Sequence, residues 1–199
     1  MALHEVRPRH MSEYPGANVH GAGEIELREA LAKDMSRCYG ADIPSDNVAI
    51  TAGCNLAFYA AILALAAPGD EVVLPCPWYF NHEMTLTQLG VTCVPMRTQP
   101  PAFEPSVDDL RPLLTERTRA VVLVTPNNPT GAIYSPETIA AFADIAKERH
   151  IALVLDETYR DFLPSKQEQA HTLFQRPDWR DTIVHLFSFS KCVLARFPQ

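Results

Sequence analysis

The chain has 199 residues, of which 47% are hydrophobic and 21% are charged, a composition typical of a globular protein with room for one large domain. Its formal net charge is −7, so no basic surplus is available to neutralise phosphates, and general nucleic-acid binding is excluded. The N-terminal residues 1–13 are polar, and the longest apolar run, residues 58–67, is too short to cross a bilayer. We therefore expect a cytoplasmic protein that does not insert into membranes.

Cysteine and histidine spacing predicts neither a metal site nor a disulfide framework. The five cysteines are odd in number, and no pair has the C-x-x-C spacing of a zinc ligand set. The seven histidines are scattered, and none belongs to an H-E-x-x-H motif. We therefore expect reduced thiols and no bound metal.

Along the chain, residues 1–23 are rich in His, Pro and Gly without periodicity, and we expect a poorly ordered arm there. From residue 24 to residue 199 the pattern predicts one domain, which starts with a helix that stops near Gly40. Ser106 is expected to cap a short helix, with Asp109 as its capping partner. The expected strands are 47–51, 71–74, 91–95, 120–124, 151–155 and 183–187, and the further expected helices are 55–66, 81–89, 106–114 and 135–149.

This alternation of helices with nearly all-apolar strands predicts an α/β fold, in which a mostly parallel sheet carries helices on both faces. Ligands of such sheets bind beyond the carboxyl ends of the strands. Four motifs with chemically suggestive residues lie at those positions.

The first two motifs offer an anion site and an aromatic ring. Gly53 and Cys54 lie in T-A-G-C-N, where a strand leads into a helix whose free N–H groups would cradle a phosphate, although for this motif alone an ordinary turn is the better explanation of the glycine. Trp78 and Tyr79 follow another strand, and a ring there would stack on a planar heterocycle or plug the core.

The other two motifs offer amide, carboxylate and amine groups. Asn128 lies in T-P-N-N-P-T-G, where prolines fix the path and the bond to Pro129 is a candidate cis peptide; a plain loop also explains the prolines and the glycine but fits a rigid, donor-rich strand end less well. Asp156 ends an apolar strand, where a carboxylate needs a partner. A single lysine such as Lys191 is normally a solvated charge, but here it shares the strand ends of one sheet with the other motifs.

The strings N-N-P-T-G, D-E-x-Y and S-x-S-K, in this order and at these separations, resemble the class I/II aminotransferases of the fold type I pyridoxal-phosphate family. The similarity runs from residue 23 to Lys191. It implies the large cofactor-binding domain of that fold in incomplete form, without the small C-terminal domain, and pyridoxal 5'-phosphate as cofactor. Lys191 would be the catalytic residue, because it would form a Schiff base with the cofactor and move the α-proton of the substrate.

The resemblance also implies roles for the remaining motif residues. Asp156 would pair with the pyridinium nitrogen and keep the ring an effective electron sink. Asn128 and Tyr159 would bind the phenolic oxygen of the ring, and Tyr79, before Trp78, would stack on its face. The phosphate would be held by Gly53, Cys54, Ser188 and Ser190.

The chain departs from the family pattern where an arginine usually lies eight residues after the lysine, because that position is Gln199, and Arg196 has a different spacing. Transamination between an amino acid and a 2-oxo acid by a homodimer is the activity that the resemblance implies. Two alternatives stay open: a truncated, non-catalytic remnant that acts as a binding or interaction module, and a lyase or synthase that uses the same cofactor.

Overall fold

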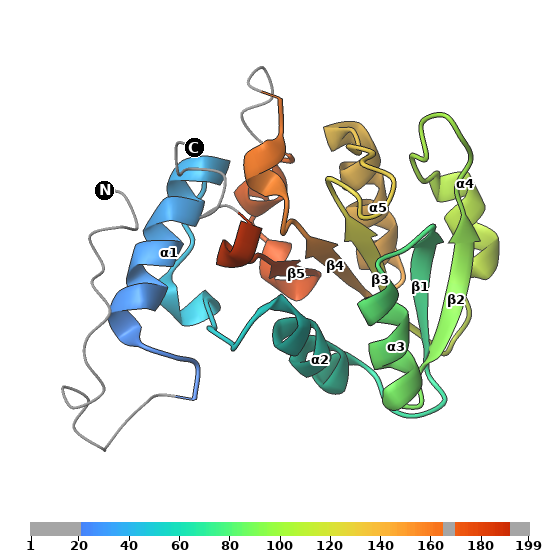
Figure 1. Cartoon of the computed structure of the whole chain (residues 1–199), viewed down its shortest axis with the longest axis horizontal. Helices are drawn as coiled ribbons and strands as arrows, with labels where there is room; N and C mark the ends of the chain where they lie inside the picture. The colour runs from blue at the N-terminus through green and yellow to red at the C-terminus, as the bar shows by residue number, and fades with distance from the viewer. Residues whose placement is uncertain (1–20, 165–169, 192–199) are drawn as a thin grey trace.

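The structure, a computed structural model, describes residues 21–164 and 170–191, which form a five-stranded sheet between two layers of helices (Figure 1). The strand order is β2-β1-β3-β4-β5, and each pair of neighbours is parallel. The fold class expected from the strand–helix alternation is therefore confirmed. The strands are β1 (Glu71–Cys76), β2 (Thr92–Arg97), β3 (Thr118–Val124), β4 (Ala152–Asp156) and β5 (Ile183–Leu186).

Helices cover both faces of this sheet, as the apolar strands predict. One hydrophobic cluster joins the sheet to α2 and α3, and a second joins its other face to α1, α4 and α5. No helix in the described ranges is both long and apolar enough to cross a membrane. The helices are α1 (Ile25–Tyr39), α2 (Cys54–Leu65), α3 (Phe80–Gln88), α4 (Val107–Leu110) and α5 (Pro136–Glu148).

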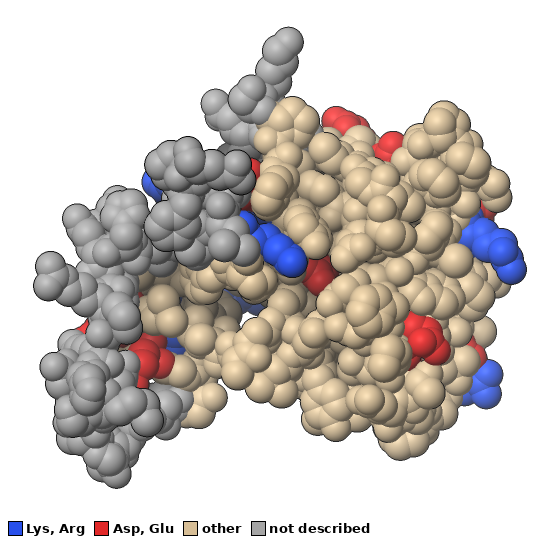
Figure 2. Space-filling model, in the orientation of Figure 1, with Lys and Arg blue, Asp and Glu red and all other residues tan. Residues whose placement is uncertain are grey.

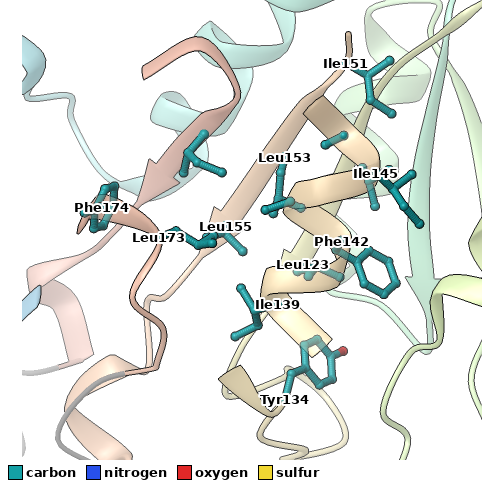
Figure 3. Packing of buried hydrophobic residues seen from close by; sticks show 14 of the residues in the cluster. Leu123, Tyr134, Ile139, Phe142, Ile145, Ile151, Leu153, Leu155, Leu173 and Phe174 are labelled. Carbon is teal, nitrogen blue, oxygen red and sulfur yellow. The ribbon is translucent and has the colours of Figure 1, made fainter. Parts of the chain in front are cut away.

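Alternation along the strands divides the core between the two faces. Leu153 and Leu155 of β4 point toward the side of α5, where they meet Ile139 and Phe142 (Figure 3). Val154 lies between them in sequence and belongs to the cluster on the opposite face. The same alternation continues past the strand end, so consecutive residues there enter different layers.

Two expected elements differ from the structure. No strand forms over the expected residues 47–51, because Asn47 ends a 3₁₀ turn and the Ile50 N–H donates to the carbonyl of Ala22 (2.8 Å) instead of to a sheet ladder. The helix expected over 106–114 is α-helical only to Leu110 and continues as a 3₁₀ turn, where Pro112 has no N–H to donate.

The cap of this short helix also differs from the expected capping box. The Ser106 hydroxyl accepts from the N–H of Asp108 (3.2 Å), whereas the N–H of Asp109 donates to the backbone carbonyl of Ser106 (3.2 Å). The N-terminal arm expected over 1–23 lies almost wholly outside the described residues, and so do Arg196 and Gln199.

Candidate active site at the carboxyl edge of the sheet

The candidate residues Asn128, Asp156 and Lys191 lie at or after the ends of three adjacent strands, at one edge of the sheet. Val124 of β3 pairs with Asp156 of β4, and Asp156 pairs with Leu186 of β5. The N–H of Thr125 donates to the carbonyl of Asp156 (3.0 Å), which holds the first loop against the end of β4. The register therefore brings the segments that carry Asn128, Asp156 and Lys191 to the same edge.

Asp156 is a buried carboxylate with two polar partners and is only 4% exposed. Its Oδ2 lies 3.2 Å from Nε2 of His82, and its Oδ1 accepts from the N–H of Thr158 (3.0 Å). Burial opposes the charged form, but the hydrogen bonds from His82 and Thr158 outweigh it and hold the pKa of Asp156 below its usual value. The carboxylate is therefore ionised at neutral pH, although it is enclosed by protein.

His82 is a site residue that the sequence motifs did not reveal. It lies in the first turn of α3, is 2% exposed, and stacks on Phe58 of α2 with ring centroids 4.0 Å apart. Its Nδ1 is buried and has no hydrogen-bond partner among the described residues. A histidine at the start of a helix after a strand end was a usable signal, because the buried carboxylate required a donor.

Tyr79, and not Trp78, is the aromatic residue next to this pair. Tyr79 directly precedes α3, and its ring meets that of His82 edge-on with centroids 5.3 Å apart. Its hydroxyl accepts a hydrogen bond from Nδ2 of Asn81 (2.8 Å). Trp78 packs instead against the apolar cluster beneath α2 and α3.

The N-terminus of α2 lies beside the end of β4. The hydroxyl of Thr158 donates to Sγ of Cys54 (3.5 Å). Gly53, just before the helix, has φ 94° and ψ 159°, no side chain caps the helix, and a Cβ on Gly53 would project into open space. Burial, with a smaller effect of the charge of Asp156, raises the pKa of Cys54 to about 11, so the thiol is neutral and only backbone N–H groups offer positive character there.

Ser188 and Ser190 line the same cavity as this helix start. Their hydroxyl oxygens are 2.8 Å apart, and the N–H of Ser190 also donates to Oγ of Ser188 (3.3 Å). Both serines, together with Gly53 and Cys54, line a cavity of about 690 Å³ that continues between α1, α2 and β5. The structure thus groups the four residues expected at the phosphate. The cavity is not lined by the other candidates, namely Tyr79, Asn128, Asp156, Tyr159 and Lys191.

The two asparagines of the loop after β3 have different surroundings. Asn127 is buried, donates to the hydroxyl of Tyr134 (3.0 Å), and accepts from the N–H and the hydroxyl of Thr130 (3.2 and 2.7 Å). Asn128 is half-buried, and its peptide bond to Pro129 is cis, as expected. Asn127 therefore shapes the loop, and Asn128 is the residue whose amide can serve a ligand.

Lys191 ends the described part of the chain on a helical turn and is exposed. Tyr159 lies in the turn after β4, where its ring meets that of Phe162 at 6.0 Å. Within the described ranges, no hydrogen bond joins Asn128, Tyr159 or Lys191 to Asp156. No group of three or more His, Cys, Asp or Glu residues in the same ranges is arranged to hold a metal ion.

Comparison of the chain with known sequences and structures identifies its family. Residues 12–194 match the model of the family described as aminotransferase class I and II. The chain is 34% identical over 192 residues to the methionine aminotransferase of Escherichia coli (strain K12), which covers 95% of this chain and 49% of that protein. It is 32% identical over 170 residues to the aspartate aminotransferase of Thermotoga maritima, which covers 85% of this chain and 45% of that protein.

The solved structure of an alanine aminotransferase from Pyrococcus furiosus superposes with a TM-score of 0.80 at 32% identity, over 88% of this chain and 44% of that chain. The chain thus spans about half the length of the relatives that it matches. The family model covers nearly the whole chain, and the fold agrees with it. The chain therefore belongs to the aminotransferase class I and II family.

Proposed function

We propose that this chain is a pyridoxal-phosphate-dependent aminotransferase that moves an amino group between an amino acid and a 2-oxo acid. The observation that carries the proposal is the buried carboxylate of Asp156, which His82 and Thr158 keep ionised at the carboxyl edge of the sheet. A negative charge in this position favours a ligand that carries a cationic group. The protonated ring nitrogen of pyridoxal phosphate is such a group. The relatives named as aspartate and methionine aminotransferases support the same activity.

The residues around Asp156 fit the rest of this cofactor. An anionic phosphate suits the uncapped start of α2 at Gly53 and Cys54, with the hydroxyl groups of Ser188 and Ser190 in the same cavity. A planar ring suits the face of Tyr79, which lies beside the His82–Asp156 pair. When bound, the cofactor supplies an electron sink for the bond that breaks at the α-carbon of the substrate.

The chain itself supplies the base and the groups that orient the ring. Lys191 would hold the cofactor, and its side-chain amine would then move the proton at the α-carbon of the substrate. Asp156 would keep a proton on the ring nitrogen, while the Asn128 amide and the Tyr159 hydroxyl would donate to the phenolic oxygen of the ring. Each of these roles uses a group at the edge where β3, β4 and β5 end.

A second copy of the chain is the partner that we propose for the surface over α2 and α3. The helix α2 is apolar all round, which is typical of a helix buried on more than one side. Figure 2 shows few charged side chains over this part of the molecule. The large apolar side chains exposed on these two helices are Leu56, Leu63, Phe80 and Met84.

The proposal is tested by adding pyridoxal phosphate to the purified chain and recording the visible absorption of bound cofactor. Lys191→Ala should abolish this band, whereas Lys33→Ala, a change of an exposed lysine on α1, should leave it intact. Release of a 2-oxo acid from an added amino acid would establish transamination. Release of ammonia or of a cyclic product would identify a lyase or a synthase, and no band at saturating cofactor would contradict the proposal and favour a binding module.

A further inference from the structure

A second buried carboxylate, Glu157, has no role in the chemistry proposed above. Its side chain is fully buried, and it lies on the opposite face of the sheet from Asp156. The hydroxyl of Tyr39, at the end of α1, donates to its Oε2, and Nε2 of His185 on β5 lies 2.9 Å from the same oxygen. Nε2 of His171 lies 3.4 Å from Oε1. Three separate segments thus converge on this one carboxylate.

One hydrogen bond to the ring of His171 indicates which of its nitrogens carries the proton. The N–H of Leu173 donates to Nδ1 of His171 (3.1 Å), so that nitrogen carries no proton. The proton of the neutral ring is therefore on Nε2, toward Glu157. The ring also stacks on that of Tyr39 with centroids 4.9 Å apart, which fixes it in this orientation.

Arg160, which follows the turn 158–159, also contacts α1 and the end of β5. Its guanidinium lies 4.1 Å from the ring centroid of Phe187, just after β5. Its Nη2 is 3.3 Å from Oδ2 of Asp34, and its Nη1 is 3.0 Å from Sδ of Met35, both on α1. Glu157 and Arg160 therefore lie on either side of Thr158 and Tyr159, as a buried carboxylate and a largely buried guanidinium.

We propose that Glu157, assisted by Arg160, is a positioning residue that holds the turn 158–159 against α1 and thereby orients Asp156 toward the cofactor. This inference rests on the function proposed above. Thr158 directly follows Glu157, and its N–H is one of the two groups that hold the Asp156 carboxylate. If Glu157 loses its partners, an unpaired buried charge is left, and the turn moves to expose it. The bond to Asp156 is then lost with it.

The test compares Glu157→Gln and Tyr39→Phe with the wild-type chain, and uses Glu148→Gln as the control. Glu148 is an exposed carboxylate at the end of α5, 3.7 Å from Arg111. The readouts are the dissociation constant for pyridoxal phosphate, the amide hydrogen exchange of residues 158–159, and the pH profile of the bound cofactor's visible absorption. At metal sites, loss of the hydrogen-bond partner behind a ligand typically lowers the binding affinity by about tenfold or more, and a carboxylate held in the same way should respond similarly. We expect a rise of about tenfold in the dissociation constant, faster exchange and a displaced pH profile in both variants, but not in the control.

Each other outcome also decides the question. Variants that unfold at lower urea but keep the wild-type affinity and pH profile would show that Glu157 serves stability alone, and would overturn the inference. If the wild-type chain binds no cofactor, the proposed function fails, and hydrogen exchange still shows whether Glu157 holds the turn. If Glu157→Gln does not fold, Tyr39→Phe, which keeps the carboxylate and removes one hydroxyl, decides by the same three readouts.

Discussion

Asp156 and Glu157 are consecutive buried carboxylates that enter opposite faces of the sheet, and each lies against histidine. Asp156 meets His82 of α3 in one layer, and Glu157 meets His185 and His171 in the other. Alternation past the end of β4 produces this arrangement, because successive side chains of an extended chain point in opposite directions. The end of β4 is therefore held from both helical layers.

Replacement of His82 by phenylalanine should cost about 1–3 kcal/mol of unfolding free energy at pH 7, because the buried carboxylate loses a donor while the stack on Phe58 can persist. The pKa of Asp156 is depressed in the folded chain, so its contribution exists above the unfolded value of about 4 and disappears as the pH falls through the folded value. The deficit of the variant should therefore shrink below about pH 4. Urea unfolding of the variant and the wild-type chain at pH 7 and below about pH 4 measures this difference in unfolding free energy. An equal difference at the two pH values would contradict this account.

Protonation of His171 should weaken the fold in mild acid. Burial lowers its pKa to about 4, against the opposing charge of Glu157. A depressed folded pKa means that the stability is fully present above the unfolded value of about 6.5 and is lost as the pH falls toward 4, by up to about 3 kcal/mol.

Unfolding free energies between pH 7.5 and pH 4 check this expectation. His171→Gln should be less stable at neutral pH but should show a flatter slope, by about one proton. His150→Gln, a change of an exposed histidine after α5, should keep the wild-type slope. A slope that His171→Gln leaves unchanged would assign the acid sensitivity to other groups.

Gly53 and Gly69 form a matched pair for testing the anion site. Both have positive φ (94° and 92°), and at both a Cβ would meet no atom within 4 Å. Alanine at either position should therefore cost about 1–3 kcal/mol through backbone strain alone. Only Gly53→Ala should also weaken pyridoxal phosphate, because only Gly53 borders the cavity at the start of α2. Dissociation constants for the cofactor measure the difference, and equal affinities in the two variants would remove Gly53 from the site.

The fold could be predicted where one segment's own pattern decides its structure. The apolar runs that became β3 and β4 and the periodic segment that became α5 are recognisable without knowledge of any neighbour. Residues 48–51 have the same apolar character, but a strand exists only when its backbone finds a ladder, and Ile50 bonds to Ala22 instead. Pairing between distant segments is the information that a local pattern lacks.

Contacts between distant segments also explain why the sequence does not reveal the roles of His82 and Glu157. The position of Asp156 at the end of an apolar strand indicates that its carboxylate needs a polar partner. The sequence does not identify that partner as His82, because His82 reaches Asp156 only when α2 and α3 pack on the same face of the sheet. Glu157 was not singled out, since its partners come from α1, β5 and the segment before Leu173. Motif residues could be found from the sequence, and the buried groups that hold them could not.

Introduction of charge on the apolar surface of α2 and α3 should break the dimer that we propose. Leu63 is 56% exposed and Met84 is 49% exposed, so a lysine at either position can fold in the monomer. Burial of such side chains at an interface contributes about 1.5–3 kcal/mol each, and Leu63→Lys or Met84→Lys should weaken association by tenfold or more. Ile133→Lys, in the loop before α5, is the control, since Ile133 is 36% exposed away from these helices. Sedimentation at matched concentrations measures the effect, and a monomeric wild-type chain, or variants as dimeric as the control, would refute the assignment of this surface.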